Sequence, residues 1–214
     1  MIFNYSFQSQ NENGDFQSYI HNIRVNIMLW DDETCEPNIH AGYAEMVYWN
    51  RQLSRRHCSE APSEICDYVS QHMIDLYHDI FQKDSYCLKE SVARQLDLEE
   101  EIWDLDILDI CLVNRIVIYP EYRGQGILHE LLKNIGSQIG TRALIAGIPF
   151  PLQFEDKVFR QDGHELDGLP TDITFEEAQK KVRTHYIKNG LKKARSAPRW
   201  LFLTPFSLPV KYGD

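Results

Sequence analysis

The chain has 214 residues, of which 43% are hydrophobic and 25% are charged, as expected for a single folded domain with a sizeable core. Its formal net charge of −10 disfavours general nucleic-acid binding, because an acidic surface repels phosphate backbones. The same charge would attract a cationic substrate, or it serves only to keep the protein in solution.

The first half of the chain predicts a hairpin followed by helices. Residues 1–15 are expected to be loosely ordered. Two extended runs, residues 23–30 and 40–49, predict a β-hairpin with a long loop in the turn-forming sequence between them. Apolar residues at steps of three and four predict a helix over residues 63–82, and a second helix is expected over residues 86–100.

The second half alternates strands and helices. Residues 106–119 are apolar and β-branched, which predicts a long buried strand with a bend at residues 113–115. Pro120 ends this strand, and a glycine turn leads into a helix over residues 126–139, whose apolar residues form one stripe. The next strand is expected over residues 143–154 and should be irregular at its prolines.

A polar insertion and a last helix complete the pattern. Residues 155–172 form the insertion, and a loop of this length in a compact domain is often a functional lid. Thr174 begins another helix through a capping box. Two short strands, residues 191–197 and 199–204, follow that helix and are separated by a proline.

The cysteines and histidines indicate which cellular compartment to expect and whether a metal site is present. The five cysteines are an odd number without a C-x-x-C pair, a pattern typical of reduced thiols rather than of a disulfide scaffold or a zinc ribbon. No basic-then-apolar leader and no apolar run of 18 residues is present, so we expect a cytoplasmic protein without a membrane span. His72, Asp75 and Asp79 share one side of a predicted helix, which we interpret as a solvated face, and we expect no metal.

The strongest site signal is the glycine turn between the long strand and its helix. Residues 116–128 read IVIYPEYRGQGIL, and Gly124 and Gly126 would let backbone N–H groups at the helix start approach a diphosphate closely. A plain strand-to-helix turn also explains two glycines. A Walker loop would need Gly-Lys-Ser/Thr, and a dinucleotide fingerprint would need glycine where His129 stands.

This segment resembles motif A of the GNAT N-acetyltransferases, [Q/R]-x-x-G-x-[G/A] after a strand. The apolar and glycine places of the motif are filled by Ile116, Ile118, Gly124 and Gly126. The segment departs from the motif at Glu121, where Gln or Arg is commoner, and at Leu128, where many members have Gly. Both departures are mild because the family's pyrophosphate contacts are mostly made by the backbone.

A second resemblance follows downstream. Residues 186–191 (YIKNGL) are similar to the family's Y-x-x-x-G-F segment, with Leu191 in place of Phe. Together the resemblances cover residues 106–204, about half of the chain. The first half fits less well, because its two expected helices follow a hairpin, whereas common members place them after the first strand.

The resemblance implies one GNAT-like domain over residues 1–214, with a lid-like insertion at 155–172. It implies an α/β (α+β) fold, in which a central mixed, mostly antiparallel twisted sheet is flanked by helices and splayed at the acetyl-CoA strand. Acetyl-CoA would be the acyl donor and no metal would be needed. The residues implied to bind it are Ile116, Val117, Ile118, Arg123, Gly124, Gln125, Gly126, Ile127 and Leu128.

The implied reaction moves an acetyl group from acetyl-CoA directly to a primary amine. By its family position, Tyr186 would be the acid that protonates the leaving thiolate, and the backbone N–H near Ile118 would polarise the thioester carbonyl. Some members carry a glutamate as base at the position of Leu112, so that role does not carry over. Three acidic residues on or near extended runs could act as the base through water, and each is equally well interpreted as a surface or paired carboxylate: Glu45, Asp106 and Asp109.

Two other functions stay open at this point. A GNAT-like module that binds acyl-CoA without catalysis would need the same glycine turn, and Tyr186 favours the enzyme over it. Acetylation of aminoacyl-tRNA, as in small toxin members of the family, is disfavoured by the charge of −10. The expected partners are therefore acetyl-CoA and a cationic amine whose identity stays open, with no nucleic acid or membrane, in a monomer or homodimer.

Overall fold

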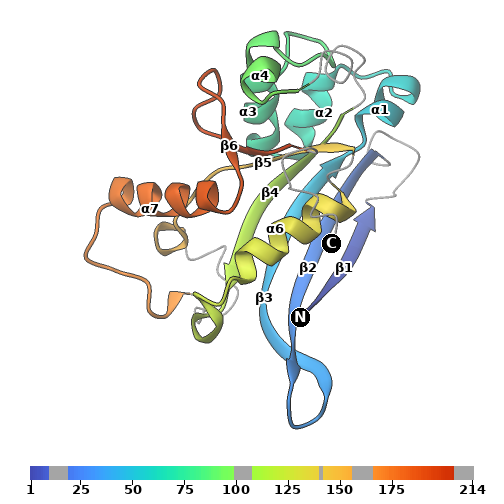
Figure 1. Ribbon diagram of the computed structural model, residues 1–214. Helices are drawn as coiled ribbons and strands as arrows, with labels where there is room; N and C mark the ends of the chain where they lie inside the picture. The colour runs from blue at the N-terminus through green and yellow to red at the C-terminus, as the bar shows by residue number, and fades with distance from the viewer. Residues whose placement is uncertain (10–18, 99–107, 140–141, 156–165, 205–214) are drawn as a thin grey trace, which may run out of the picture.

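The computed structural model describes residues 1–9, 19–98, 108–139, 142–155 and 166–204 (Figure 1). Its strands are β1 (Ile2–Ser9), β2 (Ile20–Asp31), β3 (Glu36–Trp49), β4 (Asp109–Ile118), β5 (Ala143–Gly147), β6 (Lys192–Lys193) and β7 (Leu201–Leu203). Its α-helices are α1 (Arg51–His57), α2 (Pro62–Val69), α3 (Gln71–Ile80), α4 (Glu90–Gln95), α6 (Ile127–Gln138) and α7 (Phe175–Lys188). Two 3-10 helices, η2 (Pro120–Tyr122) and η3 (Leu152–Phe154), follow β4 and β5.

These strands form one mixed sheet of seven strands in the order β1-β2-β3-β4-β5-β7-β6. Within it β4 and β5 are parallel, and every other neighbouring pair is antiparallel. The parallel pair needs a crossover connection, which α6 supplies. The expected α/β class, a mixed and mostly antiparallel sheet flanked by helices, is confirmed.

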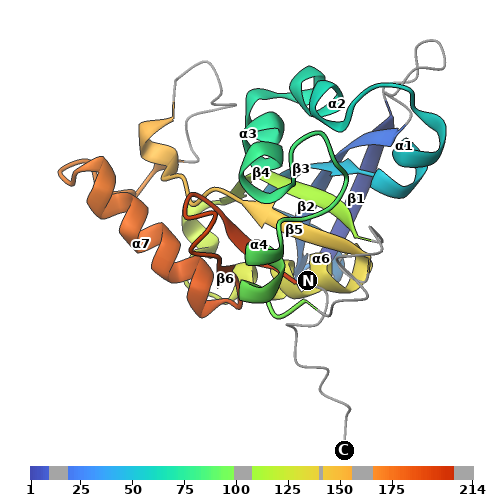
Figure 2. The same ribbon diagram turned by 90° about the horizontal axis from the view of Figure 1, so that it is seen from above.

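Helices cover both faces of the sheet (Figure 2). On one face, here called the α3 side, helices α2, α3 and α4 pack against strand residues such as Trp49 and Leu112. On the other face, the α6 side, α6 packs against residues such as Met46 and Cys111, and α7 adds Tyr186. Because neighbouring residues of a strand point to opposite faces, successive residues of a strand belong alternately to the two cores.

The chain from β1 to α1 differs from the sequence expectation in three places. Of residues 1–15, which were expected to be loose, Ile2–Ser9 form β1, and residues 10–15 lie outside the described ranges. The Tyr5 hydroxyl donates to the Asn134 side chain of α6 at 2.7 Å. The hairpin is confirmed, but its long loop is wrong, since Asp31 of β2 already pairs with Glu36 of β3. Helix α1 was not expected, although the Asn50 side chain caps it.

The single helix predicted over residues 63–82 is two helices. Ser70 has an extended backbone, with φ −175° and ψ 159°, and its side chain accepts the N–H of Met73. It therefore ends α2 and begins α3, because a side-chain cap competes with continued helix. The helix predicted over residues 86–100 is confirmed as α4 alone, and residues 99–100 lie outside the described ranges.

The second half follows the expectation closely. Strand β4, helix α6 and helix α7 are confirmed, and the capping box of Thr174 and Glu177 forms as predicted. Strand β5 ends at Gly147 rather than at residue 154, because the prolines that follow cannot donate to a ladder. The last two strands form but are shorter. Of the predicted insertion, residues 156–165 lie outside the described ranges.

Strand β4 has the bend that the sequence predicted. Glu45 of β3 pairs with Arg115, and Met46 pairs with Val113, so Asn114 is an extra residue, a β-bulge. On its other edge, β4 pairs with β5 from Asp109 to Val113. Beyond the bulge β4 continues to Ile118, while the chain after β5 turns away. The two parallel strands therefore part at the bulge.

Candidate functional site

The turn between β4 and α6 presents backbone N–H groups to open space. Gly124 and Gly126 have left-handed backbones, with φ +78° and +79°, and a Cβ built on either would have nothing within 4 Å. In the described part of the chain, the N–H groups from Gly124 to His129 have no acceptor, and the first main-chain bond runs from Glu130 to the Gly126 carbonyl at 3.2 Å. With the positive end of the α6 dipole, the turn has the donors that a diphosphate needs.

Side chains brace the turn from behind. Arg123 donates through Nε to the Ile118 carbonyl at 3.0 Å and through Nη1 to the Asp167 carbonyl at 2.6 Å. The Gln125 amide donates to the Glu121 carbonyl at 3.0 Å. These contacts fix the turn and tie it to the C-terminal end of the polar insertion, which leaves the backbone as the part of the turn that faces outward.

The remaining residues expected to bind the cofactor fall into two groups. The side chains of Val117, Ile127 and Leu128 are buried in the core, so they shape the turn without facing a ligand. Ile116 lines a cavity beside the turn. The Tyr119 N–H donates to Ala41 of β3 at 2.9 Å, and alternation along the strand therefore directs the Ile118 N–H away from β3.

A cavity of about 720 Å³ lies where β4 and β5 part. Its walls come from both sides of the sheet, since Leu132 and Tyr186 belong to the α6 side, whereas Ser70 and His72 lie at the start of α3. Leu132 is five residues along α6 from Ile127, or about 8 Å at 1.5 Å per residue. The cavity therefore begins close to the turn and passes through the sheet.

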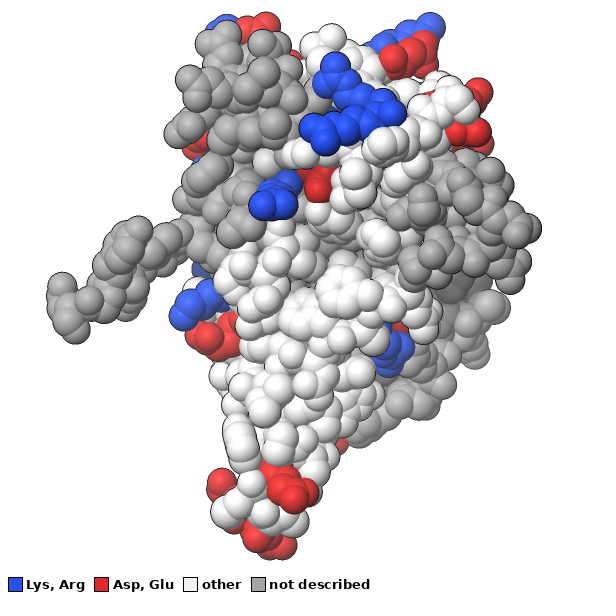
Figure 3. Space-filling view, turned by 90° about the vertical axis from the view of Figure 1, so that its right-hand side faces the viewer, with Lys and Arg blue, Asp and Glu red and all other residues white. Residues whose placement is uncertain are grey.

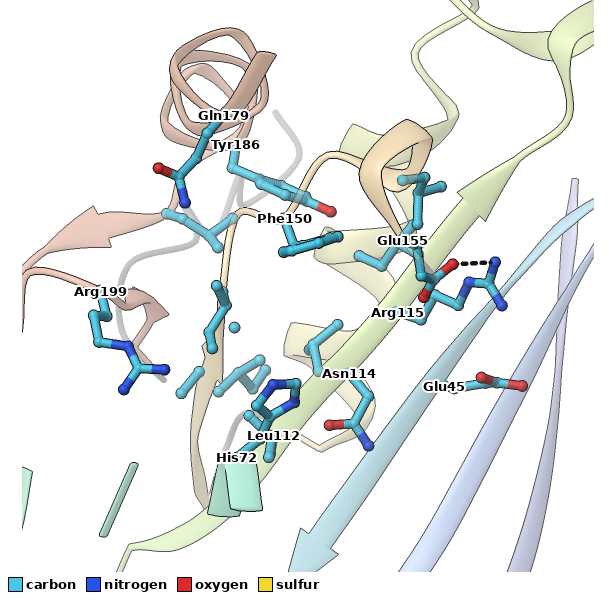
Figure 4. Close-up of a pocket in the computed structure, with 18 of the residues that line it drawn as sticks. Glu45, His72, Leu112, Asn114, Arg115, Phe150, Glu155, Gln179, Tyr186 and Arg199 are labelled. Carbon is cyan, nitrogen blue, oxygen red and sulfur yellow. Dashed lines mark ion pairs between the residues drawn. The ribbon is translucent and has the colours of Figure 1, made fainter. Parts of the chain in front are cut away.

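Tyr186, to which the sequence resemblance assigns the role of acid, lines this cavity from α7. Figure 4 shows its ring beside Phe150, with the hydroxyl directed into the cavity. Among the described residues no group hydrogen-bonds that hydroxyl. Burial raises the pKa of Tyr186 to about 12, so the phenol is protonated at neutral pH and acts as a donor.

A row of alternating charges crosses the α3 side at the bulge. Glu45 accepts from Arg24 at 2.8 Å, and both side chains are 35% exposed. Glu45 also pairs in register with Arg115, whose guanidinium meets Glu155 at 2.7 Å. In Figure 4 the Glu45 carboxylate lies beyond Arg115 and points toward β2. Glu45 lines the cavity while its charge is balanced by arginine.

The three candidate bases have different positions. Glu45 lines the same cavity as Tyr186. Asp109 does not, because it is buried at the start of β4, where it accepts from the Tyr48 hydroxyl at 2.5 Å and from the Gln52 N–H at 3.4 Å. Burial raises the pKa of Asp109. Asp106 lies outside the described residues.

The sequence reasoning missed several residues that the structure brings to the site. Asn114 lines the cavity as the bulge residue, and His72 and Arg199 line it from α3 and from the chain before β7. The predicted bend at residues 113–115 was the available signal for Asn114. Leu112, where the family's glutamate would stand, is buried and also lines the cavity.

Comparisons with models of protein families, with curated proteins and with solved structures find no match for this chain. None of the helices in the described ranges has the length and apolar character needed to cross a lipid bilayer.

Proposed function

We propose that the protein is an acetyl-CoA-dependent N-acetyltransferase with a GNAT fold. The observation that carries the proposal is the union of two features: a glycine turn with unused N–H groups at the start of α6, and a cavity that opens where the parallel strands β4 and β5 part. The turn suits the diphosphate of acetyl-CoA, and the cavity suits its pantetheine arm and acetyl group.

In this proposal the acetyl group lies beside β4. The Ile118 N–H points to the side from which β5 has turned away, where it can donate to the thioester oxygen as negative charge builds there. The amine nitrogen of the acceptor attacks the carbonyl carbon, the N–C bond forms, and the C–S bond breaks to release the CoA thiolate. A single oriented donor of this kind is typically worth about 3–4 kcal/mol of barrier.

Glu45 is the group that receives the amine proton, through water. A lysine-like amine with a pKa of about 10.4 must lose its proton to attack, at a cost of ~4.6 kcal/mol at neutral pH. Glu45 lines the cavity, is partly exposed and carries a carboxylate toward which an ammonium group would be drawn. Its ion pair with Arg24 means that water, rather than direct contact, relays the proton.

Tyr186 donates a hydrogen bond to the departing sulfur. Its pKa of about 12 lies above that of a thiol, about 8.5, so complete transfer of the phenol proton would cost roughly 5 kcal/mol. A hydrogen bond to the thiolate requires no such transfer. The proton that finally neutralises the thiolate therefore comes from solvent, and Tyr186 stabilises the charge meanwhile.

The Arg24–Glu45 ion pair also favours a second candidate, a GNAT-fold module that binds acyl-CoA without catalysis. The Glu45 carboxylate already has a guanidinium partner at 2.8 Å, and an ion pair of this kind is equally compatible with a purely structural role. Such a module would use the same turn and cavity for binding. It would differ from the enzyme in releasing no thiol when an amine is added.

One experiment separates these candidates. Release of CoA thiol from acetyl-CoA is followed across a panel of primary amines, alongside the melting temperature with and without acetyl-CoA. The enzyme predicts both a raised melting temperature and amine-dependent release, reduced in a Glu45→Gln variant. A raised melting temperature without release for any amine would favour the binding module. Absence of both effects at millimolar acetyl-CoA would refute the proposal.

A further inference from the structure

A second, smaller hollow lies on the α3 side of the sheet, next to the bulge of β4. It measures about 350 Å³. Its polar walls come from four strands: Ser6, Gln8, Asn22, Arg24, Glu45 and Asn114. Glu45 and Asn114 also line the larger cavity. The two hollows therefore meet at the point where the proposed base stands.

Three side-chain amides in this hollow have no hydrogen-bond partner among the described residues. In the described part of the chain, Gln8, Asn22 and Asn114 make no side-chain hydrogen bond. Each amide offers two donors and one acceptor. The Ser6 hydroxyl adds a weak bond to the Arg24 carbonyl, at 3.3 Å. A ligand here would meet neutral hydrogen-bonding groups from β1, β2 and β4.

The charges of the hollow cancel. Among the described residues that line it, Arg24 is the cation and Glu45 the anion, and they pair at 2.8 Å. The Arg24 guanidinium also lies 4.2 Å from the centre of the Tyr43 ring. Figure 3, which looks onto the β1 edge, shows a broad uncharged area with a few separate lysine or arginine side chains, and acidic groups at the tip of the β2–β3 hairpin. The hollow thus offers no unshared cation to a phosphate or carboxylate.

Resting on the proposed acetyltransferase function, we infer that this hollow holds the acceptor and that the acceptor is a small primary amine with several hydroxyl groups, of the amino sugar class. Its amine faces Glu45 at the junction with the larger cavity, and its hydroxyls bond to Gln8, Asn22 and Asn114. Hydroxyl groups both donate and accept, as side-chain amides do, so the two sets satisfy each other.

The backbone geometry argues against a peptide acceptor. Peptides that bind to sheets add their main chain to an exposed edge. The hollow lies over a face instead, where the main chains of β2 and β3 are committed to their ladders on both edges. Its size is at the lower end of the roughly 300–1,000 Å³ typical of ligand sites. A compact ring fits this space better than an extended chain.

The test measures acceptor binding without turnover. Saturation-transfer NMR is recorded on the full chain with glucosamine in the presence of CoA, which carries no acyl group to transfer. We expect saturation to reach the ring protons of glucosamine. Transfer to cyclohexylamine, which keeps the ring and the amine but lacks the hydroxyls, should be weaker by about tenfold or more, because it can form none of the hydrogen bonds to Gln8, Asn22 and Asn114.

Two variants remove one amide each at nearly constant volume. Asn22→Leu and Gln8→Met should each weaken glucosamine binding about 3- to 10-fold, the usual range for one neutral hydrogen bond. Asn4→Leu is the matched control, since Asn4 is on the same face of β1 as Gln8 but does not line the hollow. It should bind glucosamine as the unaltered chain does.

Several outcomes would overturn the inference. These are equal transfer to glucosamine and cyclohexylamine, unchanged binding in both Asn22→Leu and Gln8→Met, or stronger binding of trialanine or of glucosamine 6-phosphate. The proposed function is judged separately, by release of thiol from acetyl-CoA in parallel samples. Glucosamine that binds at the hollow without thiol release would contradict the acetyltransferase and leave the binding site established.

Discussion

Replacing Gly124 by Asp and by Asn tests whether the turn before α6 holds a diphosphate. Gly124 has φ +78° and open space around a built Cβ. Asn and Asp adopt this left-handed conformation more readily than other residues with a side chain, so both variants should fold with similar, small losses of stability. They have the same shape and differ in one negative charge.

The charge sets the expected difference in affinity. A carboxylate about 5 Å from one unit of phosphate charge costs ~0.8 kcal/mol in water and ~3.3 kcal/mol at an effective dielectric constant of 20. Gly124→Asp should therefore bind acetyl-CoA roughly 4- to 250-fold more weakly than Gly124→Asn. Because the Debye length falls from about 10 Å at 0.1 M salt to about 3 Å at 1 M, the difference should shrink in high salt.

Titration calorimetry with acetyl-CoA at both salt concentrations measures this difference, and thermal melting without ligand confirms that both variants fold. Gly190→Ala is a further control, because Gly190 also has a positive φ, +103°, and open space, yet follows α7. It should lose stability without a specific loss of affinity. Equal affinities of the Asp and Asn variants at low salt would refute a diphosphate at the turn.

Three further predictions concern buried groups. Tyr186→Phe should lower kcat about 10- to 100-fold, which corresponds to the loss of one hydrogen bond to a charged group. The affinity for acetyl-CoA should stay within about threefold. Turnover equal to that of the unaltered enzyme would exclude the donor role of Tyr186. Burial raises the pKa of Asp109 in the folded chain. The protonated Asp109 carboxyl therefore contributes to stability below the unfolded pKa of about 3.9, and this contribution is lost as pH rises through the pKa of the folded state. Urea unfolding of Asp109→Asn should therefore show stability that improves relative to the unaltered chain between pH 4 and pH 7, and the opposite trend would contradict this sign. Glu155→Gln removes the charge opposite Arg115, whose side chain is 6% exposed, and should cost about 3 kcal/mol of unfolding free energy. Glu90→Gln removes one member of an exposed helical ion pair and should cost at most about 0.5 kcal/mol of unfolding free energy. Equal urea midpoints for Glu155→Gln and Glu90→Gln would show that burial does not strengthen the Arg115–Glu155 ion pair.

The segment from β4 to α6 could be predicted from sequence because its signals are local. A β-branched run gives the strand, Pro120 ends it, and Gly124 and Gly126 take left-handed backbones that few other residues adopt. The capping box that begins α7 is equally local. Tyr186 lies near the end of α7, as the sequence predicted, because that helix begins at a recognisable cap.

The N-terminal strand was missed although its signal was present. Phe3, Tyr5 and Phe7 alternate with Asn4 and Ser6, the period of a half-buried strand. The break at Ser70 could not be read from apolar spacing, because the spacing continues through it. The signal at this point is local and different in kind, because the Ser70 side chain caps the next helix.

The polar hollow lay beyond sequence reasoning because it depends on register. Gln8 lies opposite Asn22, and Arg24 lies opposite Glu45, only for one pairing of three strands. A slip of one residue would send these side chains to the other face. For the same reason, the sequence could not distinguish Glu45 from Asp109 as a base, since the Tyr48 hydroxyl that engages Asp109 lies on another strand.

The central claim is that acetyl-CoA binds with its diphosphate at the turn and its acetyl group between β4 and β5. Amide NMR spectra of the labelled chain, recorded as acetyl-CoA is added, test it most directly. The account predicts the largest shifts at the amides from Gly124 to His129, with further shifts at Ile116 and Ile118. Binding that leaves the Gly124 and Gly126 amides unmoved, or no binding at millimolar acetyl-CoA, would contradict it.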